Sequence, residues 1–432
     1  MNILNHARFA LKMDVSLKLA TPLLLRSGRT GDITDSAIER TPEGDLHVNG
    51  YVWASLLRRC LDRIKDGKTF SAQIGKYQDK QGVSPLWCEA TVANLHATAV
   101  NPGIAIDRKW GATKSGALFN DELAIAGLPL TLRLTLFAPD PDTAKQWQAA
   151  LISALGVIHS GIENIGGGWT YGYGRLQVDA VKHATLNLAD AGQRALLWDW
   201  NNLPWETTQP PSVLPALDKP VTIINVKAKV ADGQLMAVKS RVFPLDAPKF
   251  GKLPDWFVFR RNIWNDEKKS SEQKPVLPGK ALRQALFSVP LERKWRSRNE
   301  TACFPDTKGS CGCRRCRWFG GTDAAGIIAV TDAPVETPAF EVVSRVQLCE
   351  HSMQNMNLFS SEYLTGGTFS FRILIDGARS DDAETLVGEV RELLAEMQGE
   401  TAPPGWYRLG GTSTCTGQVQ VLDYSVTGSN QP

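Results

Sequence analysis

Apolar and polar residues alternate along residues 14–25, where Val15, Leu17 and Leu19 lie on one side of the chain. A period of two predicts a half-buried β-strand. After a polar, glycine-containing loop, apolar residues recur every three or four positions from Gly50 onward. This second pattern predicts an amphipathic helix with outward-facing arginines. The order continues with an alternating strand over 123–137, a helix over 142–159, a glycine-rich loop and the short strand RLQV.

The second half of the chain shows the same order of patterns. It has an alternating run VTIINVKAKV, a long polar loop and a helix that starts at Lys280. A cysteine-containing insertion, the alternating run TFSFRILI, a helix over 382–398, a glycine loop and the strand QVQVL follow. Strand, helix, strand repeated twice is the order of the ferredoxin-like split βαβ fold, which RRM-type domains share. We therefore predict an α+β protein with two tandem ferredoxin-like (RRM-type) domains.

A repeated motif supports this duplication. The motif Leu118-Phe119-x-x-Glu122 returns as Leu358-Phe359-x-x-Glu362, and each copy is followed by glycine five residues after the glutamate. The spacing between the copies has the size of a whole domain. The proline-rich residues 205–220 lack hydrophobic periodicity, which predicts a semi-rigid linker. We place the boundary near Ser212, with a first domain over 1–212 and a second over 213–432.

The bulk composition is that of an ordinary folded protein. With 432 residues, two domains are the default expectation. No segment approaches eighteen consecutive apolar residues, so we expect a cytoplasmic protein without a membrane span. A net charge of +3 does not by itself indicate a nucleic-acid binder. Residues 293–317, however, hold eight basic residues against two acidic ones, which is either a solvated loop or a phosphate-binding surface.

Four cysteines lie within fourteen residues, in the spacing C-x7-C-x-C-x2-C. Four reduced thiols are the ligand set of a tetrahedral structural zinc site, and the alternative is a loop of unliganded thiols. Four thiolates leave no open coordination position, so the expected role of Zn²⁺ is to fold an insertion over about 293–318. The predicted ligands are Cys303, Cys311, Cys313 and Cys316.

The glycine-rich loop GGGWTYGYG at 166–174 is neither a Walker loop nor a dinucleotide fingerprint. It lacks the Lys-Ser/Thr pair, and it precedes a strand where those motifs precede a helix. Glycines let the backbone approach another chain and leave amide donors for phosphates. Trp169, Tyr171 and Tyr173 have rings that can stack on bases. A purely structural turn is the alternative.

Several short segments, in a fixed order, resemble a known family. The first half contains TPLLLRSG, TDSAIER, NGYVWASLLRR, IDRKWGATKSGALFNDE and GGGWTYGYGR. The second half contains the related VLPGKALRQAL, CRRCRWFGG, LFSSE and LGGTSTCTGQ. The chain thereby resembles the RAMP superfamily of CRISPR-associated proteins, and in particular a type III effector backbone subunit with two fused RAMP domains. The matches extend over residues 19–421.

This resemblance implies a subunit of an antiviral effector complex that binds guide (CRISPR) RNA. Guide–target pairing would select a single-stranded target RNA, and other effector subunits would be partners. Each backbone domain would insert a β-hairpin thumb, for which 85–99 and the cysteine insertion are candidates. The expected RNA-binding residues are Arg58, Arg59, Arg63, Arg108, Lys109, Lys114 and Arg283, together with Gly167, Gly168, Trp169, Tyr171, Tyr173, Arg175, Gly410 and Gly411 of the glycine loops.

The resemblance also implies metal-dependent cleavage of the target RNA. The family's loop aspartate, which supports cleavage with Mg²⁺ or a similar divalent ion, falls on Asp35, with Asp32 as the rival position. In the second half it falls on Asp255, with Asp246 as the rival. Aromatic neighbours of Asp255 are an unusual setting for a hydrated cleavage site, which suggests an inactive second repeat. The chemistry of a single loop aspartate, without the family, indicates only a turn residue.

Two alternatives to an RNA-guided endoribonuclease remain. The first is a non-catalytic RNA-binding scaffold subunit of the same complex. The second is a guide-RNA processing endoribonuclease that uses histidine as general acid–base without a metal. None of the six histidines lies inside a repeated motif, which ranks this alternative last. The second glycine loop also lacks the aromatic residues of the first, so its contact with RNA is expected to differ.

Overall fold

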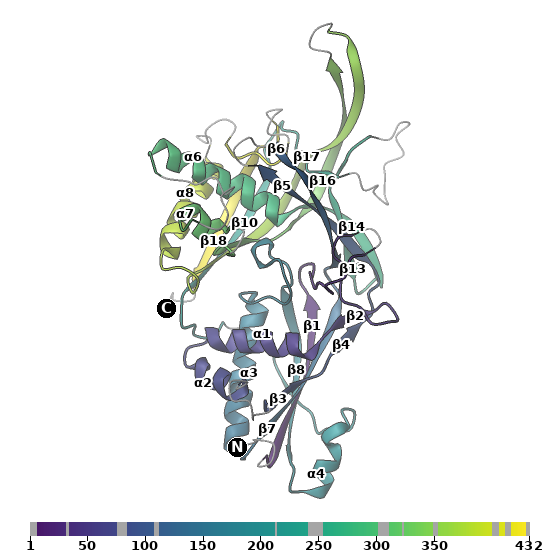
Figure 1. Cartoon of the computed structure of the whole chain (residues 1–432), viewed down its shortest axis with the longest axis vertical. Helices are drawn as coiled ribbons and strands as arrows, with labels where there is room; N and C mark the ends of the chain where they lie inside the picture. The colour runs from purple at the N-terminus through teal and green to yellow at the C-terminus, as the bar shows by residue number, and fades with distance from the viewer. Residues whose placement is uncertain are drawn as a thin grey trace.

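The computed structural model describes residues 7–31, 34–75, 84–107, 112–211, 214–240, 254–300, 311–321, 324–348, 353–399, 406–410 and 416–428. The molecule is elongated, with the first half of the chain at one end and most of the second half at the other (Figure 1). In the described part no helix is both long enough and apolar enough to span a membrane.

The first half is built on a five-stranded antiparallel sheet. Its central strand, β1 (Phe9–Leu19), lies between β7 (Pro129–Ala138) and β8 (Leu176–Asn187). Two short strands, β3 (Leu86–Cys88) and β9 (Glu206–Thr208), extend the sheet beyond β7 and β8. The helices α1 (Gly50–Arg63), α2 (Gly67–Gly75) and α3 (Pro141–Ser160) contribute to one hydrophobic core with this sheet.

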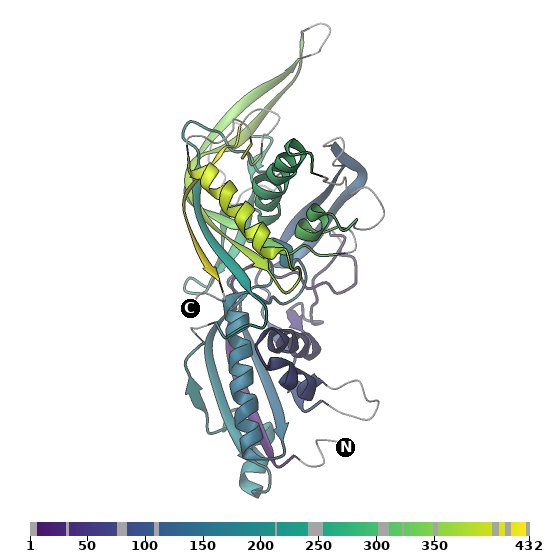
Figure 2. The ribbon, with the colours of Figure 1, turned by 90° about the vertical axis from the view of Figure 1, so that its left-hand side faces the viewer.

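The second half repeats this plan with β10 (Val221–Val230) in the centre. Strands β17 (Asn355–Asp376) and β18 (Val419–Gly428) flank it, and β15 (Ile328–Val330) pairs with β17 on the far side. Helix α8 (Ala383–Gln398) covers this sheet much as α3 covers the first, as Figure 2 shows. A segmented helix, made of α5 (Gly279–Leu282), the π-helix η4 (Arg283–Ser288) and α6 (Val289–Ser297), stands at the place of α1.

Equivalent strands occupy equivalent positions in the two sheets. The orders β8-β1-β7-β3 and β18-β10-β17-β15 match element by element, and all these pairs are antiparallel. Even the register shift in the central strand recurs, between Ser16 and Leu17 and between Lys227 and Ala228. The predicted α+β class is confirmed, and the antiparallel sheets are compatible with the predicted ferredoxin-like fold.

Two β-hairpins extend from this framework. In the first half β5 (Thr98–Asp107) pairs with β6 (Ala112–Ala124), and this hairpin reaches toward the second half. In the second half β16 (Ala333–Leu348) pairs with β17 and forms the long projection at the top of Figure 1. Within the thumb candidate 85–99, β3 pairs with β7 and β4 (Thr91–Ala93) pairs with β2 (Leu46–Val48), so these strands belong to the body of the first half.

The remaining elements are short. They are α4 (Ala191–Ala195), α7 (Arg314–Phe319), the 3₁₀ helices η2 (Trp169–Tyr171) and η3 (Leu196–Trp198), and the strands β11 (Lys239–Ser240), β12 (Phe257–Val258), β13 (Arg260–Asn265) and β14 (Ser270–Leu277).

The two halves share part of their core. Residues of the second half that follow the linker pack into the hydrophobic core of the first: Val221, Ile223, Trp264, Ala329 and Leu374. The segment predicted as a linker also packs against the first half, since the Lys65 N–H donates to Ala216 O at 2.9 Å and Leu217 is buried. The predicted boundary at Ser212 lies outside the described residues.

A buried ion pair joins the halves at the same place. The Arg63 guanidinium of α1 contacts both carboxylate oxygens of Asp376, at 2.6 and 2.8 Å, and Asp376 is fully buried. Arg63 also contacts Glu163 at 2.7 Å, and Arg379 contacts Asp376 at 2.8 Å. Burial opposes ionisation of Asp376, but Arg63 and Arg379 prevail and lower its pKa.

Candidate functional site

Asp35 lies in the loop before α1 and is fastened to β6 through both its backbone and its side chain. Its N–H donates to the carbonyl oxygen of Asn120 at 2.9 Å. The Asn120 N–H in turn donates to Oδ2 of Asp35 at 2.6 Å. The side chain is exposed to solvent. This closed pair of hydrogen bonds therefore holds a carboxylate in a fixed, water-accessible place beside the β5–β6 hairpin.

Asp255 is held in the same way against β17. Its N–H donates to Ser360 O at 3.1 Å, and the Ser360 N–H donates to Oδ2 of Asp255 at 2.7 Å. Asp255 is exposed, whereas its neighbours Phe257 and Phe259 are 4% and 6% exposed. These two aromatic side chains thus point into the protein, and the Asp255 carboxylate lies at the surface.

The repeated glutamate explains why the two loops have the same shape. Glu122 accepts the N–H of Ile38, three residues after Asp35, at 3.1 Å and binds Arg40 at 2.5 Å. A charged acceptor that binds both a backbone amide and an arginine fixes the loop strongly.

Glu362 makes the same contacts in the second half. It accepts the N–H of Val258, three residues after Asp255, at 2.8 Å. It also receives both terminal nitrogens of Arg260, at 2.7 and 2.9 Å. The two glutamates are the last residues of the repeated LF-x-x-E motif. The motif therefore anchors the aspartate loop in each half, and Asp35 and Asp255 occupy equivalent positions.

The cations beside the two aspartates differ. Next to Asp35, Arg26 is neutralised by Asp121, with nitrogen–oxygen distances of 3.0 to 3.3 Å. At the equivalent place beside Asp255, Lys239 donates to the hydroxyl of Ser361 at 3.0 Å. Burial, followed by the nearby Arg345, lowers the pKa of Lys239. The serine in place of an aspartate gives the second site a more positive surrounding than the first.

A small pocket of about 140 Å³ opens at the second aspartate. Asp255, Val342, Ser344, Leu358 and Ser360 line it. It therefore combines one carboxylate, two hydroxyls and apolar side chains of the β16–β17 hairpin. Such a mixture suits a ribose or base edge next to a carboxylate better than it suits a bare ion.

Most predicted RNA-binding residues on α1 have intramolecular partners. Arg59 is paired with Glu163 at 3.0 Å and donates to Asn164 O at 2.9 Å. Arg63 belongs to the junction between the halves described above. Arg58 is exposed and remains a candidate for contact with RNA. The amphipathic pattern identified the polar face of the helix correctly, but most of this face contacts protein.

The aromatic residues of the glycine loop contact protein, and their predicted stacking on RNA stays a prediction. Tyr173 is 1% exposed, and its hydroxyl group is bonded to Asn101 at 3.2 Å and to Arg261 at 2.8 Å. The ring of Trp169 faces the Arg379 guanidinium at 4.3 Å, and the Trp169 Nε1–H donates to Ile162 O at 3.3 Å. Tyr171 is half-buried with its ring edge-to-face on Tyr173.

The glycines of this loop serve close approach to protein backbone. A Cβ on Gly166 would lie 2.4 Å from Leu24 O, and one on Gly172 would lie 2.8 Å from Thr331 of the second half. Gly167 donates its N–H to Leu24 O at 2.8 Å, and Gly168, at φ +76, has Tyr173 against it. The structural turn, the alternative in the sequence, is therefore the one that the contacts support.

The other predicted residues divide into two groups. Arg283 donates to Phe319 O, and its guanidinium lies 5.6 Å from the Phe319 ring, so it is engaged within the protein. A Cβ on Gly410 would lie 2.2 Å from Ala237 O, as in the first glycine loop. Lys114 lies on β6. The positions outside the described residues are Asp32, Asp246, Arg108, Lys109, Gly411 and Cys303.

Three of the four predicted zinc ligands converge. The sulfur atoms of Cys311, Cys313 and Cys316 all lie within 4.8 Å of one another, and those of Cys311 and Cys316 are 3.9 Å apart. A tetrahedral site with Zn–S bonds of about 2.3 Å has sulfur–sulfur edges of about 3.8 Å. The observed spacing therefore fits Zn²⁺ and is far too long for a disulfide. The three cysteines could hold a metal ion such as zinc, and the predicted fourth ligand, Cys303, lies outside the described residues.

The histidines in the described part support protein structure. His96 stacks on Trp264 at 3.8 Å, and Nδ1 of His159 accepts the Val178 N–H at 3.1 Å. His183 bonds to the Thr208 hydroxyl at 2.9 Å, and His47 lies 3.9 Å from Glu39. No two of these histidines share a contact that would form an acid–base pair in the described part of the chain.

Sequence comparison agrees with the motifs of the first half. The family model described as the RAMP superfamily matches residues 16–177. This segment runs from β1 through the Asp35 loop and the glycine loop to the start of β8. No curated protein matches the sequence. Residues 16–177 are therefore a segment of the RAMP superfamily, as the motifs of the first half predicted.

Proposed function

We propose that the protein is a backbone subunit of a type III CRISPR effector complex, with two fused RAMP domains. In this proposal it binds guide RNA and cleaves complementary target RNA. The observation that carries the proposal is the duplicated aspartate loop, in which Asp35 and Asp255 are exposed and held by equivalent hydrogen bonds. A chain with an equivalent carboxylate in each half has two equivalent sites that one extended RNA could contact.

Exposed apolar side chains on the hairpins beside the aspartates support the proposal that an RNA base is displaced at each site. Phe340, Val346, Met356 and Leu358 on the β16–β17 hairpin are 37% to 61% exposed, and Phe119 on β6 is 41% exposed. Apolar side chains that project from a protein can wedge between bases and unstack them. A nucleotide displaced by such a wedge would lie beside the aspartate that is anchored to the same hairpin.

The proposed chemistry requires little of the protein beyond positioning. The 2′-hydroxyl oxygen of the displaced nucleotide attacks the adjacent phosphorus, and the P–O5′ bond breaks. The hydroxyl proton passes to solvent and O5′ takes a proton from water, which leaves a 2′,3′-cyclic phosphate and a 5′-hydroxyl. Bound Mg²⁺ would neutralise charge on the phosphate.

The aspartate would hold that ion, as one carboxylate of a site completed by substrate oxygens and water. Asp35 fits this role because Oδ2 is fixed by the Asn120 amide, which orients the whole carboxylate. Within the described residues, neither Asp35 nor Asp255 belongs to a group of three side chains that could hold a metal ion together. The site would therefore be completed only when RNA is bound.

The cysteine cluster would have a structural task. Cys313 immediately precedes α7, and Cys316 lies within it. Arg315 and Trp318 of the same helix are 1% and 0% exposed, and they contact Glu292 and Trp295 of α6. A structural Zn²⁺ would fix α7 against the segmented helix that replaces α1.

The test is to map target cuts made by the reconstituted complex with Asp35→Ala, Asp255→Ala and the double variant. We expect each single variant to lose its own cut and the double variant to lose both. Matched controls are Asp62→Ala and Asp232→Ala, which remove exposed carboxylates away from the loops. If both cuts persist in the double variant, the catalytic assignment is wrong.

The same experiment decides the scaffold alternative. Neither aspartate belongs to a group of three metal-ligating side chains in the described part, which favours a scaffold that binds RNA without cutting it. Guide binding without any Mg²⁺-dependent cleavage by the unmodified complex would establish it. A single cut that is lost in Asp35→Ala and kept in Asp255→Ala would instead show that the second repeat is inactive.

A further inference from the structure

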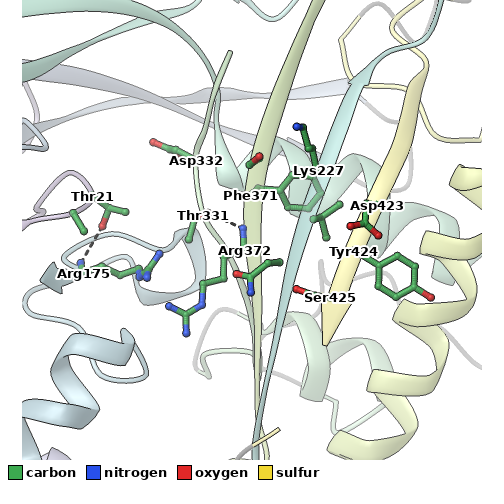
Figure 3. A pocket seen from close by; sticks show the side chains of 14 residues that line it. Thr21, Arg175, Lys227, Thr331, Asp332, Phe371, Arg372, Asp423, Tyr424 and Ser425 are labelled. Carbon is green, nitrogen blue, oxygen red and sulfur yellow. Dashed lines mark hydrogen bonds between the residues drawn. The ribbon is translucent and has the colours of Figure 1, made fainter. Parts of the chain in front are cut away.

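A cleft of about 490 Å³ lies between the two halves, away from both aspartates. Thr21 and Arg175 border it from the first half, and Thr331, Arg372, Lys227 and Ser425 border it from the second (Figure 3). We refer to it as the junction cleft. Its volume is in the range of sites that hold a small molecule or one nucleotide.

Arg175 and Arg372 enter the cleft from opposite sides. Their backbones are fixed, because the Arg175 N–H donates to the Thr21 hydroxyl at 2.9 Å and the Arg372 N–H donates to the Thr331 hydroxyl at 3.0 Å. Figure 3 shows the two guanidinium groups turned toward the same space. A threonine hydroxyl thus fixes the backbone of each arginine, and the two positively charged side chains enter the same space.

Neither guanidinium has a protein partner in the described part of the chain. The Nε–H groups of Arg175 and Arg372 are buried and donate to no hydrogen-bond acceptor. Three other inward-facing arginines have a carboxylate: Arg63 has Asp376, Arg260 has Glu362 and Arg315 has Glu292. Two nitrogens of Arg408 are also buried without a hydrogen-bond partner, so such atoms are not confined to the cleft. Two acids line the cleft: Asp332 is paired with Arg261 at 3.0 Å, and Asp423 is exposed. The distinctive feature of the cleft is that two arginines share one space (Figure 3).

This arrangement is unfavourable without an anion. Burial, and then repulsion from Arg175, lower the pKa of Arg372 to about 9, and burial lowers the pKa of Arg175. A buried charge without a partner destabilises a fold unless a ligand compensates it. Two guanidinium forks that face each other match the oxygens of a phosphate, which arginine binds in bidentate fashion.

We propose that the junction cleft binds a phosphate group between Arg175 and Arg372. Lys227, which is exposed at the rim, would add a third positive charge. The identification of the source as an RNA phosphodiester rests on the proposed function, and free phosphate is the other source of the same chemistry. RNA bound at this place would contact both halves of the chain at once.

The test uses the full chain and two ligands, inorganic phosphate and a single-stranded RNA oligonucleotide. The variants are Arg175→Met and Arg372→Met, with Arg372→Lys to retain charge and Arg194→Met on exposed α4 as the control. In phosphate-free buffer we expect both methionine variants to melt at or above the temperature of the unmodified chain. Phosphate should raise the melting temperature of the unmodified chain and the Arg194 variant, but not of the methionine variants, and Arg372→Lys should fall between.

The RNA arm identifies the source. If RNA is the ligand, each methionine substitution lowers the slope of log affinity against log salt by about 0.7, the value for one phosphate contact of a single strand. Phosphate protection with unchanged RNA affinity supports the site but assigns it to free phosphate. Equal phosphate protection in all variants overturns the proposal. These readouts need no cleavage, so they are independent of the aspartate assignment.

Discussion

Glu362→Gln provides a quantitative test of the loop anchor. Glu362 is 1% exposed, and the Arg260 side chain that it binds through two nitrogens is 6% exposed. Glutamine keeps the shape and one acceptor for the Val258 N–H, but it replaces a carboxylate oxygen at Arg260 by an NH₂ group. Removing one partner of a buried ion pair costs about 3–5 kcal/mol.

The same substitution in the first half is the matched comparison. There the Glu122 and Arg40 side chains are 15% and 35% exposed, so water screens the pair. A partly exposed pair contributes about 0–1 kcal/mol. The structure therefore predicts a difference of about 3 kcal/mol between two chemically identical changes at equivalent positions.

Thermal unfolding measures this difference. One kcal/mol shifts the melting temperature of a domain of about 150–250 residues by about 2–4 °C. We expect a fall of about 10 °C for Glu362→Gln and of a few degrees for Glu122→Gln. In the complex, Glu362→Gln should also weaken the cut assigned to Asp255. Equal melting temperatures for the two variants would refute the reasoning that burial of the anchor sets its strength.

Three further predictions concern other parts of the molecule. Metal analysis should find one Zn²⁺ per chain. The ion should be lost in Cys316→Ser and retained in the control Cys88→Ser. Equal zinc content in the two variants would contradict the site. Arg63→Met leaves the fully buried Asp376 with one fewer cation, so it should lower the free energy of unfolding by about 3 kcal/mol, whereas the exposed Arg58→Met should leave it unchanged. Burial lowers the pKa of Lys12 to about 8 from 10.5, so the unfolded chain binds more protons between these values and stability should rise with pH across that window. Denaturant titrations should show this rise in the unmodified chain and not in Lys12→Met.

Local patterns in the sequence predicted most of the framework. Alternation at Val15 and Leu17 identified the central strand, and the spacing of Trp53, Leu56 and Leu57 identified the buried face of α1, all of which are at most 1% exposed. These features depend on neighbours in the chain. The equivalence of the two aspartate loops was also accessible, because the LF-x-x-E motif preserves a single spacing between the copies.

The sequence could not show which protein side chains contact the polar face of α1. Arg59 and Arg63 were expected to meet RNA, but their partners Glu163 and Asp376 lie about 100 and 313 positions away in the chain. Tyr173 is likewise held by Arg261, 88 residues later. Such contacts depend on how the halves pack, and no periodicity records them. The anchors Arg40 and Arg260 were missed for the same reason.

The shared core between the halves has a consequence for how the duplication can change. Val221, Ile223 and Leu374 belong to the second half by sequence but fill the interior of the first. Either copy, separated from the other, would expose apolar surface, and the ion pair between Arg63 and Asp376 would be lost. Each copy therefore depends on the other for folding. A single aspartate substitution could remove the chemistry of one copy during evolution, but the rest of that copy would still be needed for the other to fold.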